Sequence, residues 1–140
     1  MEARDIISLI SKVRDCANRL IESEMESFGV EGLATSHGDI LLALLKIEKL
    51  TMKELAEKID KDKSTVTALV DKLIKQGYAL KTRDTEDNRV VFVTLTEKGR
   101  ALKPMFDEIS QKLLSTVYEG ISKSEKEELI KTLIKIKNNF

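Results

Sequence analysis

The chain has 140 residues, of which 41% are hydrophobic and 34% charged, a mixture that supports a packed core and argues against a disordered chain. Its formal net charge is zero, and its one cysteine excludes an internal disulfide. The longest apolar run, residues 40–45, is far shorter than the ~20 residues that cross a bilayer, and the N-terminus lacks a signal pattern. We therefore expect a soluble, cytoplasmic protein that has no membrane partner.

The first part of the chain shows the three- and four-residue apolar spacing of amphipathic helices. We expect one helix over residues 5–28, followed by a break that contains two glycines. A second helix is expected to begin at Thr35 or Ser36, with Asp39 at capping-box distance from the serine, and to end near Glu48.

Two short helices joined by a three-residue turn are predicted over residues 51–76. The threonine that opens this segment forms a capping box with Glu54, and Asp62 is suited to cap the second helix. Asp60 occupies the turn position that requires left-handed dihedral angles. Small or apolar side chains would face each other where the helices cross, namely Leu55, Ala56, Ile59, Val66 and Leu69. This is the spacing of a helix-turn-helix.

The pattern becomes strand-like after Gly77, which is suited to end the preceding helix. Residues 78–83 and 89–95 are β-prone, and the polar residues 84–88 between them have a length that suits a hairpin. We therefore predict that a β-hairpin follows the helix-turn-helix directly.

The C-terminal part is again helical. Thr96 is predicted to cap a helix that runs to about Tyr118 and is kinked by Pro104 in its interior. A last helix is expected to begin at Ser122 or Ser124. The predicted order is α-α-α-α-β-β-α-α, a mainly α fold with a small β-hairpin wing.

The second helix of the predicted helix-turn-helix opens with three hydroxyl residues, Ser64, Thr65 and Thr67. Serine and threonine are mediocre helix formers, but short hydroxyl side chains in a first helical turn suit contacts with base edges and phosphates. Residues 61–103 also hold ten basic and six acidic residues, so a basic centre lies between acidic ends. These features favour a DNA-binding surface over a surface hairpin with incidental hydroxyls.

Residues 50–102 resemble the MarR (multiple antibiotic resistance regulator) family, above all in the motifs DKSTVT.LVDKL..QGY, RD.EDNR and VTLTEKGRAL. The resemblance implies a homodimer of winged helix-turn-helix subunits that binds pseudo-palindromic double-stranded DNA. It implies a repressor that leaves DNA when a small aromatic or amphipathic effector binds or a cysteine is oxidised. Apolar stripes on the terminal helices predict a dimerisation region, residues 1–32 and 101–140, around a DNA-binding lobe, residues 33–100.

The same resemblance assigns the site residues. The recognition helix would contact the major groove and neighbouring phosphates through Lys63, Ser64, Thr65, Thr67, Ala68 and Lys72. The wing would contribute Arg83, Asp87, Asn88 and Arg89. A guanidinium suits the negative potential of a narrow minor groove, and Asp87 is placed to hold Arg89 in position.

Two single residues have competing interpretations. Cys16 has Lys12 and Arg19 nearby, which would favour a redox-active thiolate, but it also falls on an apolar stripe where cysteine acts as a small hydrophobe. His37, at a helix start, is predicted to be a solvated side chain, with a pH- or ligand-responsive role as the alternative.

Other functions have weaker support. The sequence has no P-loop, GxGxxG, HExxH or CxxC motif, so we expect no enzyme, no cofactor and no metal site. An effector pocket is expected where residues near 9–20, 37–45 and 100–110 meet. The alternative to a DNA-binding regulator is a winged-helix protein–protein adaptor without DNA binding.

Overall fold

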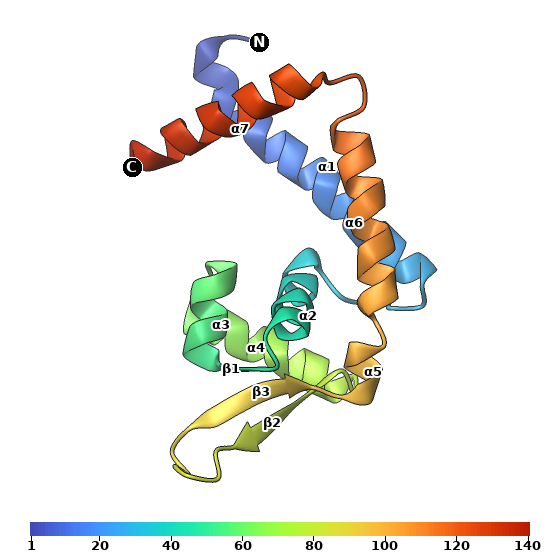
Figure 1. The fold of residues 1–140 in the computed structure, drawn as a ribbon, viewed down its shortest axis with the longest axis vertical. Helices are drawn as coiled ribbons and strands as arrows, with labels where there is room; N and C mark the ends of the chain where they lie inside the picture. The colour runs from blue at the N-terminus through green and yellow to red at the C-terminus, as the bar shows by residue number, and fades with distance from the viewer.

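The computed structural model describes all residues from 1 to 140, and they form a mainly helical fold with one small antiparallel sheet (Figure 1). The helices are η1 (Ala3–Asp5), α1 (Ile6–Ser27), α2 (Thr35–Lys46), α3 (Met52–Ile59), α4 (Lys63–Lys75), α5 (Glu97–Arg100), α6 (Lys103–Val117) and α7 (Lys123–Asn138). The strands are β1 (Lys49–Thr51), β2 (Ala79–Arg83) and β3 (Val91–Leu95). The predicted fold class is confirmed. None of the helices combines the length and apolarity that a membrane crossing requires.

The helix ends follow local side-chain chemistry, as predicted. Thr51 Oγ1 accepts from the Glu54 amide at 3.2 Å, and Glu54 Oε1 accepts from the Thr51 amide at 3.0 Å. Asp62 Oδ1 accepts from the Thr65 amide at 2.7 Å and so caps α4. Gly77, with φ of +84°, follows α4 in the left-handed conformation that ends helices.

Strand β1 was not predicted. Its three residues pair antiparallel with β3, Leu50 opposite Val93, so that β3 becomes the central strand of the order β1-β3-β2. A segment this short shows no alternating pattern, and its last residue, Thr51, is also the N-cap of α3. Only pairing with β3 about forty residues later identifies it as a strand.

The prediction of one kinked helix from Thr96 to Tyr118 was wrong. The segment forms two helices, α5 and α6, separated by a turn at residues 101–102. Pro104 lies in the first turn of α6, where the missing proline N–H would have no partner within the helix. The proline therefore marks a helix start and does not kink a continuous helix.

The prediction of a solvated His37 and of a capping box at Ser36 was also wrong. His37 is 7% exposed, and its Nδ1 accepts from the Ala34 amide at 2.9 Å, so the imidazole performs the capping assigned to Asp39. Burial, and then the nearby charge of Lys72, lower the pKa of His37, whereas the charge of Glu22 acts in the opposite direction. The neutral ring is the form that can accept this hydrogen bond.

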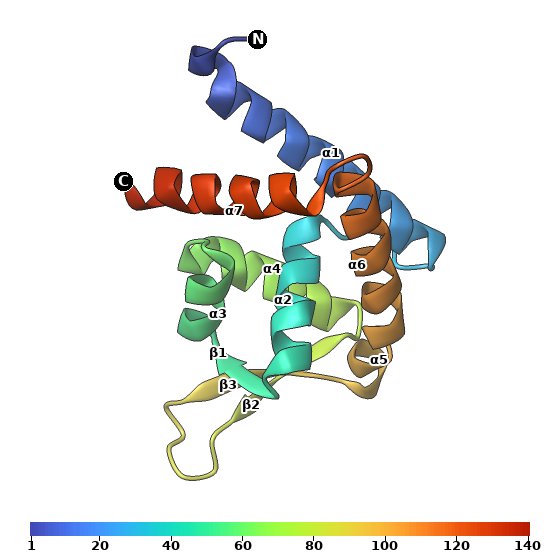
Figure 2. The same cartoon turned by 45° about the horizontal axis from the view of Figure 1, so that its top comes forward.

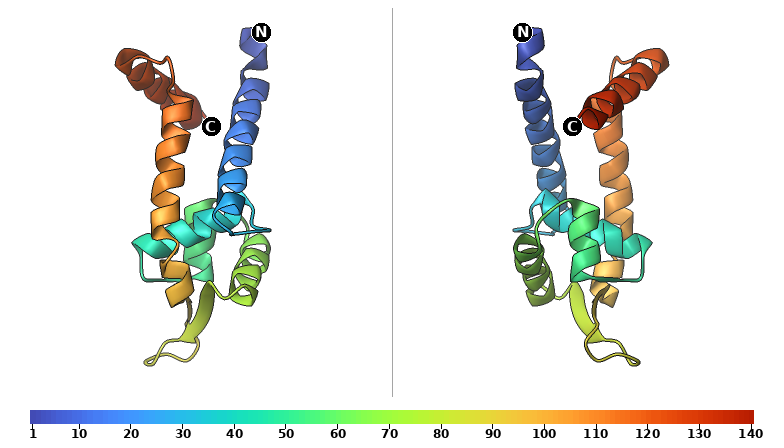
Figure 3. Two further views of the ribbon diagram at one scale, coloured as in Figure 1. Left: turned by 90° about the vertical axis from the view of Figure 1, so that its right-hand side faces the viewer. Right: turned by 90° about the vertical axis from the view of Figure 1, so that its left-hand side faces the viewer.

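The helices are arranged as a stalk above a lobe. Helices α1 and α6 pack side by side and rise from α2, α3, α4 and the sheet, while the β2–β3 hairpin projects at the opposite end (Figures 1 and 3). Helix α7 leaves the far end of α6 as a separate arm and contains no buried residue (Figure 2). Its apolar side chains are therefore without a partner in the same chain.

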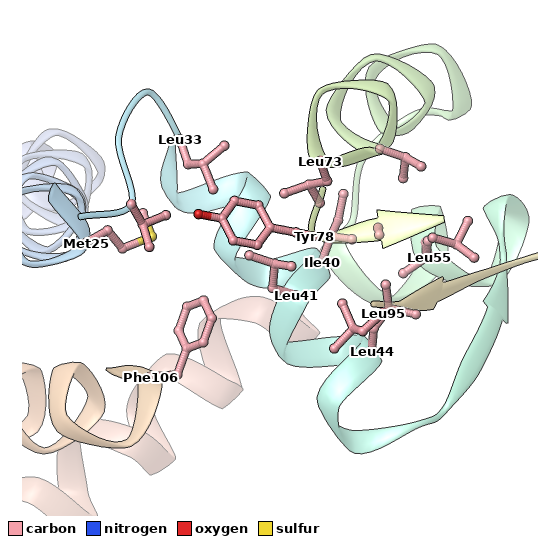
Figure 4. Packing of buried hydrophobic residues seen from close by; sticks show 14 of the residues in the cluster. Met25, Leu33, Ile40, Leu41, Leu44, Leu55, Leu73, Tyr78, Leu95 and Phe106 are labelled. Carbon is pink, nitrogen blue, oxygen red and sulfur yellow. The ribbon is translucent and has the colours of Figure 1, made fainter. Parts of the chain in front are cut away.

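One hydrophobic core joins the lobe to the base of the stalk. Met25 of α1 and Phe106 of α6 belong to the same buried cluster as Leu41 of α2, Leu55 of α3 and Leu73 of α4 (Figure 4). Helix α2 packs against α1, α3, α4 and β3, and thus lies between the stalk and the helix-turn-helix. A displacement of α2 would consequently be felt by both parts.

Candidate nucleic-acid interface

The turn between α3 and α4 has the geometry that the helix-turn-helix spacing predicted. Asp60 is the one non-glycine residue with a positive φ, +56°, and the amide of Lys61 bonds to the Ala56 carbonyl at 3.1 Å. Leu55 and Val66 are fully buried where the helices face each other. The partly buried Ala56, Ile59 and Leu69 pack against the same core.

Burial of one face of α4 exposes the predicted contact residues on the other. Val66, Val70 and Leu73 are fully buried. Lys63, Ser64, Thr65 and Ala68 are exposed, and Thr67 is half-buried. The first turn of α4 is therefore free to approach a partner.

Hydrogen bonds fix the hydroxyl groups of this turn. Asp62 Oδ1 accepts from Ser64 Oγ at 2.9 Å as well as from the Thr65 amide, and these bonds, the amide bond first, lower the pKa of Asp62. Thr67 Oγ1 donates to the Lys63 carbonyl at 2.8 Å. Both hydroxyls donate within the protein, so each presents its remaining lone pairs outward as an acceptor.

Lys72 is separate from this first-turn group. Its ammonium donates to the carbonyl of Gly32, in the loop between α1 and α2, and so ties the recognition helix to the base of the stalk. Lys63, in contrast, makes no ion pair and no side-chain hydrogen bond. The two lysines predicted to lie near phosphates thus have different surroundings.

The wing tip holds Arg89 in a defined orientation. Its Nε and Nη2 donate to the two carboxylate oxygens of Asp87 at 3.0 and 3.1 Å, which confirms the predicted contact. Arg83 Nη1 donates to the Asn88 carbonyl at 2.7 Å and closes the loop beneath the tip. The Arg89 side chain is nevertheless 90% exposed, so its remaining N–H donors face solvent.

Charge and hydrogen bonding at the tip reinforce each other. Bonds from the Arg89 side chain and backbone lower the pKa of Asp87, and the bond to Asp87 raises the pKa of Arg89. Both groups therefore stay ionised near neutral pH, and the arginine keeps its preset geometry.

The wing and α4 enclose one hollow of about 470 Å³. Thr67 of α4, Met52 of α3 and Arg83 of the wing line it, and an ion pair between Lys81 and Asp71 at 3.5 Å joins β2 to α4. Sequence reasoning missed Lys81, because nothing in the local pattern pairs a strand residue with a helix residue ten positions earlier. The exposed ion pair orients the hairpin more than it stabilises it.

Cys16 lies on α1 in a groove beside α6. It is exposed, receives a hydrogen bond from Arg19 Nη2 at 3.3 Å, and lines the groove with apolar residues such as Leu20 and Val117. The basic neighbour and the apolar surroundings are both present, so the two interpretations of Cys16 stay open as predictions.

Residues 32–106 match the family described as transcriptional regulator SarA/Rot. The HTH-type transcriptional regulator SarZ of Staphylococcus aureus (strain USA300) is 37% identical over 94 residues, which are 67% of this chain and 62% of SarZ. The chain thus spans less than two thirds of the length of this relative. Both names are those of transcriptional regulators and not of enzymes.

Solved structures share the fold over nearly the whole chain. A MarR protein from Peptoclostridium difficile has a TM-score of 0.86 and 21% identity, with 99% of this chain and 89% of that chain covered. A mutant MarR from E. coli complexed with operator DNA has a TM-score of 0.82 and 21% identity, with 97% and 99% covered. The winged helix-turn-helix fold that the resemblance to the MarR family implied is therefore confirmed for this chain.

Proposed function

Because the chain belongs to the SarA/Rot family of transcriptional regulators, we propose that it acts as a homodimer that binds a pseudo-palindromic operator in double-stranded DNA. The observation that carries the proposal is the pairing of an exposed hydroxyl-rich first turn of α4 with an exposed, oriented Arg89 on the adjoining wing. A recognition helix enters the major groove by its N-terminal residues, and a basic wing tip suits the minor groove beside it. The mutant MarR of E. coli is itself complexed with operator DNA.

In this proposal each exposed residue has a distinct role. Ser64, Thr65, Thr67 and Ala68 contact base edges, whereas Lys63 contacts phosphate. Arg89 enters the minor groove, with Asp87, Asn88 and Arg83 fixing its approach. Lys72 acts at the border of the interface, because its ammonium is bonded to Gly32 and must exchange that partner for a phosphate.

The composition of the recognition surface favours DNA over a protein partner. An adaptor surface would present large apolar side chains in the first turns of α4, because protein interfaces are built around apolar and aromatic anchors. Among the exposed residues from 63 to 68 the one apolar side chain is Ala68. The surplus of positive charge in residues 61–103 also suits a phosphate backbone.

The unpartnered apolar residues of the stalk support the homodimer. Leu129, Ile130, Leu133 and Ile134 of α7 are each at least 40% exposed, as is Val13 of α1. A second copy would cover these side chains in a two-fold arrangement built from residues 1–32 and 101–140. Two lobes, residues 33–100 of each subunit, would then present their recognition helices to successive turns of the duplex, ~34 Å apart.

Release by an effector fits the position of α2. This helix packs against both the stalk and α4, so a small molecule bound beside it would change the spacing of the two lobes. We propose that the protein is a repressor regulated in this way. A cavity between α1, α2 and α6 is the proposed effector site.

The test is a fluorescence anisotropy titration of the full chain with a duplex taken from the DNA upstream of its own gene. A scrambled duplex of equal length serves as the comparison, and the titration is repeated across a range of salt concentrations. We expect tighter binding to the upstream duplex and an affinity that falls steeply as salt rises. Equal, weak binding to both duplexes would contradict the proposal.

Arg89→Ala tests the wing within the same assay. Loss of a guanidinium from the minor groove should weaken operator binding by about ten- to a hundredfold. Arg4→Ala is the matched control, because Arg4 is an exposed arginine at the N-terminus, far along the chain from the wing. Unchanged affinity in Arg89→Ala would remove the wing from the mechanism.

A further inference from the structure

A small cavity at the junction of α1, α2 and α6 contains polar groups that the protein leaves without partners. It has a volume of about 90 Å³ and is lined on its apolar side by residues that include Leu42, Phe106 and Ile109. The Phe106 ring points from α6 toward α2 (Figure 4), where a Cβ added at Gly38 would lie 3.4 Å from it. The absence of a side chain at position 38 therefore admits the aromatic ring to this site.

Three oxygen-bearing side chains line the same cavity: Thr35, Asp39 and Ser110. Thr35 Oγ1 is buried and has no hydrogen-bond partner, which makes it the one such side-chain atom in the chain. Unpartnered buried hydroxyls cost free energy, so each one in a folded protein calls for an explanation, an absent ligand among them. The Thr35 amide is already satisfied by Glu22 at 3.2 Å, so the hydroxyl alone remains available.

The Asp39 carboxylate is also without a partner. It makes no ion pair and no hydrogen bond, and desolvation raises its pKa although the charges of Arg14 and Lys61 act in the opposite direction. Asp39 also lines a second hollow, which it shares with Lys46 and Lys58. No basic side chain lines the cavity itself, so the Asp39 carboxylate has no cationic partner inside it.

We propose that this cavity binds the head of a small primary alkylammonium ion. A primary ammonium carries three N–H donors and no acceptor, and the cavity presents three side chains that accept through oxygen. Phe106, Leu42 and Ile109 form the apolar side of the cavity and cover the first carbons of the alkyl chain. This inference rests on the effector site of the proposed function and specifies the chemistry of its ligand.

The size and charge of the cavity exclude other ligand classes. An engineered apolar cavity of roughly 150 Å³ holds benzene, so about 90 Å³ accommodates an ammonium and three or four carbons. A carboxylate of that size would face Asp39 directly and gain no cationic partner inside the cavity. A quaternary ammonium has the charge but lacks the N–H donors that Thr35 and Ser110 require.

The test is isothermal titration calorimetry on the full chain, without DNA, using butylammonium chloride, tetramethylammonium chloride and sodium butyrate as probes. We expect saturable binding of butylammonium, with tetramethylammonium and butyrate at least tenfold weaker. Asp39→Asn should weaken butylammonium binding by roughly ten- to a hundredfold, since it removes a charged hydrogen-bond partner. Glu108→Gln, which changes an exposed acid of α6 outside the cavity, should leave the affinity unchanged.

Thr35→Val provides a second variant that removes only the unpartnered hydroxyl. It should fold at least as stably as the parent chain and bind butylammonium severalfold more weakly. Absence of saturable binding, equal affinity for butyrate or tetramethylammonium, or an Asp39→Asn variant that binds normally would each overturn the inference. The calorimetric titration contains no DNA, so a failure to bind butylammonium would not contradict the proposed operator binding. A failure to bind the operator would likewise not contradict butylammonium binding.

Discussion

Replacing Gly99 by alanine should destabilise the protein, although Gly99 lies within a helix. A Cβ at this position would lie 2.2 Å from the Tyr78 carbonyl oxygen and 3.2 Å from Leu95 Cδ2. The first distance is far below van der Waals contact, and the clashing atom belongs to the backbone, so α5 must move away from β2 and β3. That movement would also disturb Thr96, whose amide donates to the Tyr78 carbonyl at 3.0 Å and whose hydroxyl caps α5.

The expected magnitude follows from these contacts. Overpacking a tight site costs about 1–3 kcal/mol, and loss of the Thr96 cap adds about 1 kcal/mol. Once the better helix propensity of alanine, about 1 kcal/mol, is subtracted, the net loss is roughly 2 kcal/mol, which corresponds to a fall in Tm of about 7 °C for a chain of this size. Helix propensity alone predicts the opposite sign, because alanine is favoured over glycine by about 1 kcal/mol within a helix.

Thermal unfolding followed by circular dichroism, at equal protein concentration for each variant, measures this difference. Gly120→Ala is the matched control: its φ is +73° and nothing lies within 4 Å of the added Cβ, so it tests backbone strain alone. We expect that control to cost about 1–2 kcal/mol. A Gly99→Ala variant with an unchanged or higher Tm would refute the steric reasoning.

Three further predictions concern stability, DNA binding and assembly. Burial holds the pKa of His37 below its ordinary 6.5, so on acidification the unfolded chain takes up the proton before the folded chain does. The free energy of unfolding should therefore fall as the pH drops below about 6.5. Urea unfolding at several pH values should show a smaller decrease for His37→Gln, which lacks the titrating ring but keeps a side chain that can cap α2. When operator binding is measured at several salt concentrations, Lys63→Ala should reduce the slope of log affinity against log salt by about 1. Lys72→Ala should reduce it by less, since the Lys72 ammonium already has a protein partner. The same reduction in both variants would contradict the different roles assigned to the two lysines. Leu133→Glu should shift the protein toward monomer in sedimentation experiments, because it places a charge on the exposed apolar face of α7. Thr132→Glu, the neighbouring control, should leave the dimer unchanged. A dimer that persists in Leu133→Glu would exclude the apolar face of α7 from the interface.

Features that depend on neighbouring residues were predictable from the sequence. The capping box of Thr51 and Glu54, the cap at Asp62 and the left-handed Asp60 each involve atoms within a few positions of one another. The Asp87–Arg89 pair is of the same kind, because the two residues lie two positions apart. Local chemistry decides such features before any tertiary contact forms.

Features that depend on distant contacts were not predictable. Strand β1 exists through its pairing with β3, and Lys72 is diverted by Gly32, forty residues earlier. His37 appeared to be a surface residue because its burial depends on how α2 packs against the rest of the chain. The unpartnered hydroxyl of Thr35 is likewise visible only once α1, α2 and α6 have met.

The hydrophobic core that unites Phe106 and Met25 with the helix-turn-helix also limits how the chain can be divided. A fragment ending at residue 100 would lack Met105, Phe106 and Ile109, all of them buried, and would expose the side of α2 that they cover. Such a fragment should be poorly folded, so the DNA-reading portion cannot be grafted onto another protein without the start of α6. For the same reason, a core substitution that weakens operator binding should also destabilise the packing at the base of the stalk. Only substitutions of surface residues should change operator binding without changing the stability of the stalk.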